Sequence, residues 1–225
     1  MNDGFPKIKI CGINDQHFAK QAESFGADYL GFIFAEGSPR RVSPETAAQI
    51  ASVLSGSARR VGVFTKSAIP EILEIASVAS LDVIQLHSVD YGADEIRKLH
   101  MAGFEVWRLY GQNTAMPMHA IIRDGDNLAD RRMNAECEGC LPDAILLDGV
   151  SGGATGGTGT LADWRLAKSM AASGIRVVLA GGISADNAVE AAKTGCAVLD
   201  VNSSLETSKA VKSMALLESF FDAIR

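Results

Sequence analysis

The sequence predicts a single-domain (β/α)8 barrel of the α/β class, and three observations favour this fold. Short apolar runs alternate with helical patterns eight times along the 225 residues. The runs are continuously apolar, as in parallel strands that are buried on both faces. Right-handed βαβ repeats of this number close into a barrel, whose usual size is about 250 residues. We therefore expect one domain over residues 1–225.

The expected elements follow one another in order. Asn14 or Asp15 can cap the first helix, and Gly26 can close it. Helices are expected at 16–25, 44–54, 69–79 and 91–101 and after each of the last three strands, the last helix reaching nearly to Arg225. Strands are expected at 7–10, 28–34, 60–64, 82–86, 104–109, 143–147, 175–180 and 197–201.

A doubly wound open sheet is the competing architecture. It usually has fewer repeats, and no G-x-G-x-x-G fingerprint follows the first strand. One segment breaks the alternation, because residues 110–142 contain Gly125, a charged run and the Cys137–Cys140 pair. We expect an expanded and irregular fifth βα unit there.

Composition and charge argue against several classes of protein. The net charge of −6 does not suit a nucleic-acid-binding surface, which needs clustered basic residues. No apolar run approaches the roughly 18 residues of a membrane span, and the first residues lack the charged-then-apolar form of a signal peptide. Four cysteines in a chain of this length do not make a disulfide framework. We therefore expect a cytoplasmic protein without nucleic-acid or membrane partners.

Residues 143–164 carry the clearest sign of a small-molecule site. The apolar run ends on the carboxylate of Asp148, and glycine-rich loops let backbone N–H groups approach an anion closely. The alternative is a flexible connection that follows an ordinary surface aspartate. Five glycines lie within eight residues of this loop: Gly152, Gly153, Gly156, Gly157 and Gly159.

Active sites of (β/α)8 barrels lie at the C-terminal face of the strands, so residues just after each strand are the candidates for chemistry. Together they supply a thiol, a carboxylic acid and cations, which suffice for acid–base chemistry on an anionic substrate. These residues are Cys11, Arg40, Arg41, His87, Arg108 and Asp148.

Several of these candidates also have a purely structural interpretation. Cys11 is either a small buried hydrophobe or, with a lowered pKa, a base or nucleophile. His87 is either a hydrogen-bonding partner or a catalytic group, and we place it with the substrate-binding residues. Arg40 follows Pro39 and is a candidate carboxylate clamp, since its planar fork matches a carboxylate. Arg41 is better explained as a solvated loop residue.

The loops after the last two strands predict a phosphate site. Gly181 and Gly182 follow the seventh strand, and Asn202, Ser203 and Ser204 follow the eighth. Barrels of this kind commonly bind phosphate with these two loops and a short helix N-terminus. We therefore expect a phosphorylated small molecule as substrate.

No metal site is expected. Cys137 and Cys140 form a lone C-x-x-C pair, whereas a structural zinc site needs about four ligands. Cys196 lies at a helix–strand junction, where we expect a core position.

Seven short motifs occur in order along the chain. They are K-I-C-G-I (9–13), G-F-I-F…S-P-R (31–40), V-G-V-F (61–64), Q-L-H (85–87), L-L-D…G-G-T-G…D-W (146–164), A-G-G-I (180–183) and D-V-x-S…E (200–206). Jointly they resemble the phosphoribosylanthranilate isomerase family from residue 7 to about residue 206, and only the segment 110–142 lacks a clear counterpart. The resemblance implies a barrel enzyme of tryptophan biosynthesis, without metal or cofactor, that is a monomer or a homodimer.

The resemblance also implies the reaction, an Amadori rearrangement of N-(5-phosphoribosyl)anthranilate to 1-(2-carboxyphenylamino)-1-deoxyribulose 5-phosphate. Asp148 would be the general acid that opens the sugar ring. Cys11, as thiolate, would be the general base that removes the C2 proton, and Arg40 would hold the anthranilate carboxylate. Backbone groups would bind the phosphate around Gly157, Gly181, Gly182 and Ser203.

The chain departs from the family pattern at several positions. The family usually has Thr at Asn14, Gly at Ser88, and Ser-Ser-Gly where this chain has Asn202-Ser203-Ser204. A side chain at Ser204 would hinder close approach of backbone to phosphate, which bears on affinity more than on reaction type. Two other functions are a paralogous barrel enzyme for another phosphorylated aminosugar or aldose, and a non-catalytic protein that binds a phosphorylated ligand.

Overall fold

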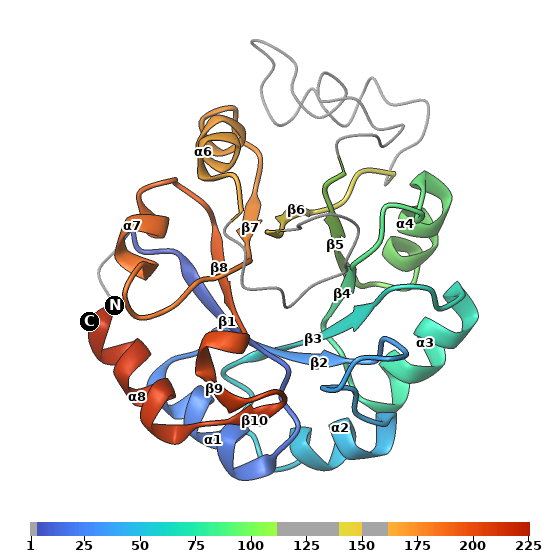
Figure 1. Cartoon of the computed structure of the whole chain (residues 1–225). Coiled ribbons are helices and arrows are strands. Elements are labelled where there is room, and N and C mark those ends of the chain that lie inside the picture. The colour runs from blue at the N-terminus through green and yellow to red at the C-terminus, as the bar shows by residue number, and fades with distance from the viewer. Residues whose placement is uncertain (1–3, 112–139, 150–161) are drawn as a thin grey trace.

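Eight parallel strands form a closed ring, as the sequence predicts (Figure 1). The computed structural model describes residues 4–111, 140–149 and 162–225. Because β8 pairs with β1, the ring is closed and an open doubly wound sheet is excluded. The strands are β1 (Lys7–Cys11), β2 (Tyr29–Ile33), β3 (Arg59–Phe64), β4 (Val83–Leu86), β5 (Glu105–Leu109), β6 (Ala144–Leu147), β7 (Val177–Leu179) and β8 (Val198–Val201).

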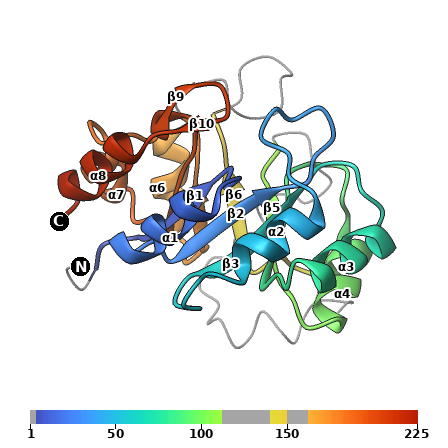
Figure 2. The same cartoon turned by 90° about the horizontal axis from the view of Figure 1, so that it is seen from below.

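The helices surround the ring on its outside, as Figures 1 and 2 show. Asp15 caps α1 by accepting a hydrogen bond from the Phe18 N–H at 2.7 Å, and Gly26 closes that helix in the left-handed conformation. Within the described ranges, no helix combines the length and apolarity that crossing a membrane requires. The helices are α1 (Gln16–Phe25), α2 (Pro44–Ala51), α3 (Ile69–Val78), α4 (Ala93–Met101), α6 (Trp164–Ala172), α7 (Ala188–Ala192) and α8 (Met214–Ala223).

A short insertion separates β8 from α8, where the sequence predicts a helix directly. It consists of a 3-10 turn, η2 (Ser203–Leu205), and a hairpin of β9 (Glu206–Ser208) and β10 (Val211–Lys212). Its strands are very short, and its turn contains Ala210 at φ 67° instead of the glycine or asparagine that marks most hairpins. The sequence therefore offers little signal for this hairpin.

Three aspartates fix the register of the barrel. Asp28, Asp82 and Asp143 each stand immediately before an even-numbered strand, β2, β4 and β6. Each carboxylate accepts a hydrogen bond from a backbone N–H of the strand before it, and each aspartate N–H donates to a carbonyl of that same strand. Such two-point attachment resists the slip by one residue that would turn every side chain to the wrong face. The backbone N–H donors to Asp28, Asp82 and Asp143 are those of Ile8 (2.8 Å), Arg60 (2.8 Å) and Val106 (2.7 Å), respectively.

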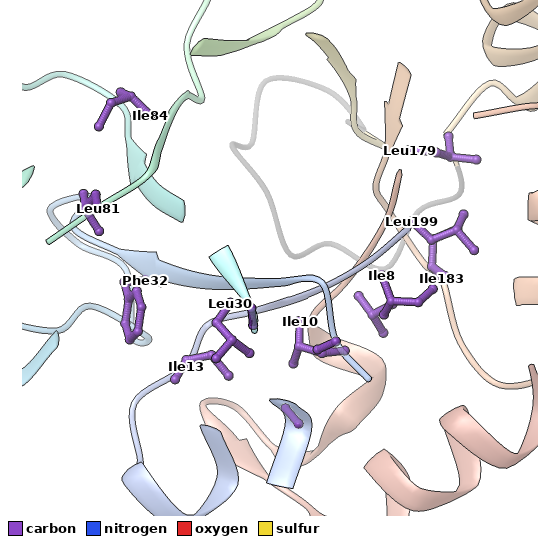
Figure 3. Packing of buried hydrophobic residues seen from close by; sticks show 14 of the residues in the cluster. Ile8, Ile10, Ile13, Leu30, Phe32, Leu81, Ile84, Leu179, Ile183 and Leu199 are labelled. Atoms are coloured by element: carbon purple, nitrogen blue, oxygen red, sulfur yellow. The ribbon is translucent and has the colours of Figure 1, made fainter. Parts of the chain in front are cut away.

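Side chains of each strand alternate between two cores. Most of those that point outward are apolar and pack beneath the helices, as Ile8, Ile10, Leu30 and Leu199 do in Figure 3. Those that point inward form layers inside the barrel, with residues of odd and even strands alternating. This alternation places every second residue of a strand inside the barrel, in layers that continue to its C-terminal face.

The inward layers change in chemistry along the barrel axis. The layer at the N-terminal end is charged and consists of Lys7, Arg59, Glu105 and Arg176. The middle layers are mostly apolar and are centred on Trp107. The layers at the C-terminal end carry Cys11 together with His87, Asp148 and Asn202, which fits the location of active sites in this fold.

Candidate active site

Cys11 is the last residue of β1 and lies inside the barrel, with 5% of its surface exposed. Lys9 points to the same inward face because it is two positions earlier on the strand. Gly31 faces both from β2, and a Cβ there would lie 2.9 Å from Cys11 Sγ and 3.0 Å from Lys9 Cε. A glycine at this position therefore leaves the space that both side chains occupy.

Beneath the thiol, Lys9 forms a buried ion pair with Asp200 of β8. The distance between Lys9 Nζ and Asp200 Oδ2 is 2.7 Å, and the lysine side chain is fully buried. Burial opposes the charge on Lys9, but Asp200 and Cys11 together outweigh it, and the pKa of Lys9 lies above its ordinary value. The middle of the barrel thus contains a permanent cation.

Two opposing effects act on the pKa of Cys11. Burial raises the pKa of the thiol above its ordinary value, and the nearby Lys9 cation opposes that rise without cancelling it. Enclosure by the barrel therefore outweighs the charge of the neighbouring lysine.

His87 and Asp148 meet at the mouth of the barrel. They follow β4 and β6, which are separated by β5 in the ring, and His87 Nε2 lies 3.3 Å from Asp148 Oδ2. This contact is too poorly aligned to count as a hydrogen bond. Gln85 Nε2 lies 3.3 Å from His87 Nδ1. The side chains of Gln85, His87 and Asp148 therefore follow one another across the mouth of the barrel.

Arg40 is buried and lies beside the C-terminal end of β1. A Cβ on Gly12, the residue after Cys11, would lie 3.0 Å from Arg40 Cδ and 2.8 Å from Asn202 Oδ1. The guanidinium forms a bidentate pair with Glu206, through Nε at 2.7 Å and one terminal nitrogen at 2.8 Å. Among the described residues, the second terminal nitrogen has no recorded acceptor, so Arg40 retains donors for a substrate anion.

Lys212 of the hairpin joins this group. Its Nζ donates to the backbone carbonyl and to the side-chain oxygen of Asn202, both at 2.9 Å, and lies 3.1 Å from Glu206 Oε1. Burial lowers the pKa of Lys212, and Glu206 opposes this change. The hairpin therefore delivers a second buried cation to the side of the site where Arg40 lies.

The loops after β7 and β8 are bound to each other. Gly181 and Gly182 have φ values of 83° and 68°, and Asn187 holds their loop by accepting from the Ser184 N–H and donating to the Gly182 carbonyl. Ser204 donates its hydroxyl hydrogen to the Ile183 carbonyl at 2.5 Å. The Ser204 side chain, which departs from the family pattern, thus has a binding partner in the neighbouring loop.

Some expected residues lie elsewhere. Gly157 and Cys137 fall outside the described residues, and Cys140 is buried. Arg108 alternates with the inward residues of β5, so it faces outward, and it donates to the Val89 carbonyl at 2.9 Å. Cys196 is buried, as expected. In the parts of the chain that are described, no group of three or more histidine, cysteine or acidic residues is placed to hold a metal ion.

Sequence reasoning assigned no role to four charged residues of this region: Lys9, Asp200, Glu206 and Lys212. Lys9 and Asp200 do carry a signal, because each interrupts an apolar strand and a buried charge requires a partner. Glu206 and Lys212 belong to the hairpin, which the sequence does not reveal.

A comparison with protein families identifies the chain. A family model described as N-(5'phosphoribosyl)anthranilate (PRA) isomerase matches residues 8–223, which is nearly the whole sequence. The chain belongs to the phosphoribosylanthranilate isomerase family. A family member from Rubrobacter xylanophilus is 36% identical over 221 residues, which cover 97% of this chain and 98% of that protein.

Solved structures of the phosphoribosylanthranilate isomerase family have the same fold. The enzyme from Thermus thermophilus superposes with a TM-score of 0.79 at 31% identity, covering 97% of this chain and 98% of that one. Another isomerase, in complex with reduced 1-(o-carboxyphenylamino)-1-deoxyribulose 5-phosphate, gives a TM-score of 0.73 at 27% identity and covers 97% of both chains. The resemblance found in the seven motifs is therefore confirmed.

Proposed function

We propose that the chain catalyses the Amadori rearrangement of N-(5-phosphoribosyl)anthranilate to 1-(2-carboxyphenylamino)-1-deoxyribulose 5-phosphate, a step of tryptophan biosynthesis, with Asp148 as general acid and Cys11 as general base. One observation carries the assignment of roles. Asp148 directly follows β6 and Cys11 is the last residue of β1, so both lie at the C-terminal face of the same barrel. A substrate between them is exposed to an acid and to a base.

Asp148 acts first in this mechanism. Its carboxyl group protonates the furanose ring oxygen, the bond between that oxygen and C1 breaks, and the nitrogen lone pair forms the Schiff base. The proximity of His87 Nε2 at 3.3 Å supports a defined orientation for the carboxyl group. His87 and Gln85 therefore serve to position the acid.

Cys11 acts second. Its thiolate takes the C2 proton, and the electron pair of the C–H bond forms the C1=C2 bond of an enolamine while the iminium nitrogen becomes neutral. Protonation at C1, with loss of the proton of the C2 hydroxyl to solvent, then gives the ketone. The hydrogen and electrons lost from C2 are balanced by the gain at C1, so the rearrangement consumes no external redox partner.

The anionic groups of the substrate are assigned to the surrounding residues. The remaining donors of Arg40 suit the anthranilate carboxylate, and His87 borders the same space. The backbone of Gly181, Gly182 and Ser203, with Gly157 from the glycine-rich loop, suits the phosphate. We infer a cytoplasmic enzyme that works as a monomer or a homodimer on this small phosphorylated substrate.

Turnover of freshly generated phosphoribosylanthranilate, followed by loss of its fluorescence, tests this assignment. We expect Asp148→Asn and Cys11→Ser each to lower kcat by about 10²- to 10⁴-fold, the range that one general acid or base contributes. Asp222→Asn, which removes an exposed carboxylate on α8, is the matched control and keeps full activity. Full activity in both site variants would contradict the proposed roles. A folded but inactive wild-type protein that turns over another phosphorylated aminosugar would instead favour the paralogous enzyme.

A further inference from the structure

The Lys9–Asp200 pair is an unusual feature of the barrel interior. Lys9 is fully buried, and its layer otherwise contains Val61, Trp107 and Val178. Removing two ions from water costs several kcal/mol per ion, and apolar residues of similar volume are often at least as stabilising. A buried ion pair in an apolar layer therefore calls for an explanation other than stability.

The location of the pair next to Cys11 suggests one. Lys9 and Cys11 lie on the same inward face of β1, and the charge of Lys9 lowers the pKa of the thiol. Asp200 accepts from Lys9 through Oδ2 alone, and among the described residues its buried Oδ1 has no hydrogen-bond partner. Asp200 thus accepts only one N–H donor of the Lys9 ammonium group. The other N–H donors of Lys9 remain available to the sulfur atom of Cys11. Gly31 confines both side chains and fixes their separation.

Other charges also face the thiol. Lys212 approaches it from β10 and Arg40 from the loop after β2, and both act on Cys11 through charge. However, the Lys212 ammonium is shared among acceptors of Asn202 and Glu206, and Arg40 forms its bidentate pair with Glu206. Lys9 is the cation that shares the inward face of β1 with Cys11 and is completely buried.

We propose that Lys9, held in place and kept charged by Asp200, is a positioning residue that stabilises the thiolate form of Cys11 for abstraction of the C2 proton. This inference rests on the proposed function, because it takes Cys11 to be the base. Lys9 keeps its own proton throughout. The thiol loses its proton to solvent before the substrate binds, and the sulfur then receives the proton that leaves C2.

Two variants test the role of Lys9. Lys9→Met removes the cation with little change in length, and Lys9→Met/Asp200→Asn also removes the carboxylate that would be left buried and unpaired. The double variant is therefore the one expected to fold without strain. Arg60→Met/Asp82→Asn removes another charged pair, between β3 and the start of β4 and away from the site, and is the matched control.

The first measurement titrates the ultraviolet absorbance of the Cys11 thiolate against pH, after subtraction of the same titration in a Cys11→Ser background. We expect the midpoint to rise by about one pH unit or more in Lys9→Met, which is the effect of removing a nearby opposite charge. The double variant shifts in the same direction by a smaller amount, because Asp200 itself opposes the thiolate. The control variant keeps the wild-type midpoint.

The second measurement is the pH dependence of kcat and KM. We expect kcat at pH 7 to fall about tenfold for each unit by which the midpoint rises, with the loss recovered at higher pH and little change in KM. An unchanged thiolate midpoint in the folded double variant, or an equal shift in the control, would overturn the proposal. The titration needs no substrate, so its result stands even if the wild-type protein fails to turn over phosphoribosylanthranilate.

Discussion

Glu206 connects the two cations on one side of the site. Its carboxylate accepts both hydrogen bonds of Arg40, lies 3.1 Å from Lys212 Nζ and accepts from the Ala210 N–H at 3.1 Å. Burial alone would raise the pKa of this carboxyl group, but Arg40 and Lys212 lower it to about 2. The orientation of Arg40 toward a substrate therefore depends on one ionised side chain.

We predict that Glu206→Gln makes the protein less stable in a pH-dependent way. Because the folded pKa of Glu206 lies below its ordinary value of 4.5, its ionisation stabilises the fold above that value. This contribution, about 3 kcal/mol at most, is lost as the pH falls toward 2. Urea unfolding of both proteins between pH 7 and pH 3 measures the difference, which should shrink with falling pH. A difference that is equal at both ends of this range would contradict the prediction.

The sequence predicts residues of this site unequally. Cys11 and Asp148 were found because each stands where an apolar run stops, which is the signal of a strand end. Lys9 and Asp200 each interrupt an apolar strand, which indicates a buried charge but not which residue is its partner. The partner of each comes from the opposite end of the chain, and only closure of the ring brings β8 beside β1. Local pattern contains no information on such a contact.

Among the elements, the β9–β10 hairpin is the least predictable, and its turn is strained. Ala210 has φ 67°, a left-handed conformation that costs a residue with a Cβ about 1–2 kcal/mol. Two hydrogen bonds of the Ala210 backbone stabilise this conformation. The Ala210 carbonyl accepts from the Asn14 side chain, and the Ala210 N–H donates to Glu206. The hairpin also carries Lys212 into the site. A locally unfavourable turn is therefore held by the contacts that it makes.

We predict that Ala210→Gly stabilises the protein by about 0.5–1 kcal/mol. Glycine removes the left-handed strain, and its greater freedom in the unfolded chain offsets part of that gain. Thermal unfolding checks the direction, and the unchanged backbone contacts should leave kcat and KM at wild-type values. Ala172→Gly, at the end of α6 and far from the turn, is the opposite control and should destabilise. A lower melting temperature in Ala210→Gly would show that the alanine is not strained.

Strands and helices of the barrel were more predictable than the hairpin, for physical reasons. The expected helix 16–25 has the observed bounds, because Asp15 caps one end and Gly26 the other. The expected strand 28–34 is observed as Tyr29–Ile33, and its start follows Asp28, whose side chain binds β1. Apolar pattern marks where a strand is buried, but hydrogen bonding decides where it begins.

On the scale of the whole molecule, the two ends of the barrel have separate roles. The C-terminal end carries the thiol and the acid, whereas the N-terminal end is closed by a cluster around Glu105. Glu105 accepts from Trp107 Nε1 at 2.6 Å and is paired with Arg59 and Arg176, and Arg176 also donates to the Tyr29 hydroxyl at 3.0 Å. In barrels of this class, such a position contributes to stability and not to catalysis.

The final prediction separates these two roles. Glu105→Gln leaves Arg59 and Arg176 without their shared carboxylate, so we expect the free energy of unfolding to fall by about 2–4 kcal/mol. This value is at the lower end of the range for breaking a buried ion pair, because the two arginines are partly exposed. For a chain of this size, that loss lowers the melting temperature by roughly 5–15 °C. Asp94→Asn breaks an exposed pair with Arg97 and serves as the control, with less than about 1 kcal/mol lost.

In the same Glu105→Gln protein, kcat and KM measured well below the melting temperature should equal those of the wild type. The carboxylate is several inward layers away from Cys11 and Asp148, and the intervening apolar layers contain the fully buried Trp107. A lower kcat with unchanged stability would mean that charge at the N-terminal end reaches the catalytic end. The functional separation of the two ends would then be wrong, and the interior of the barrel would have to be treated as one electrostatic unit.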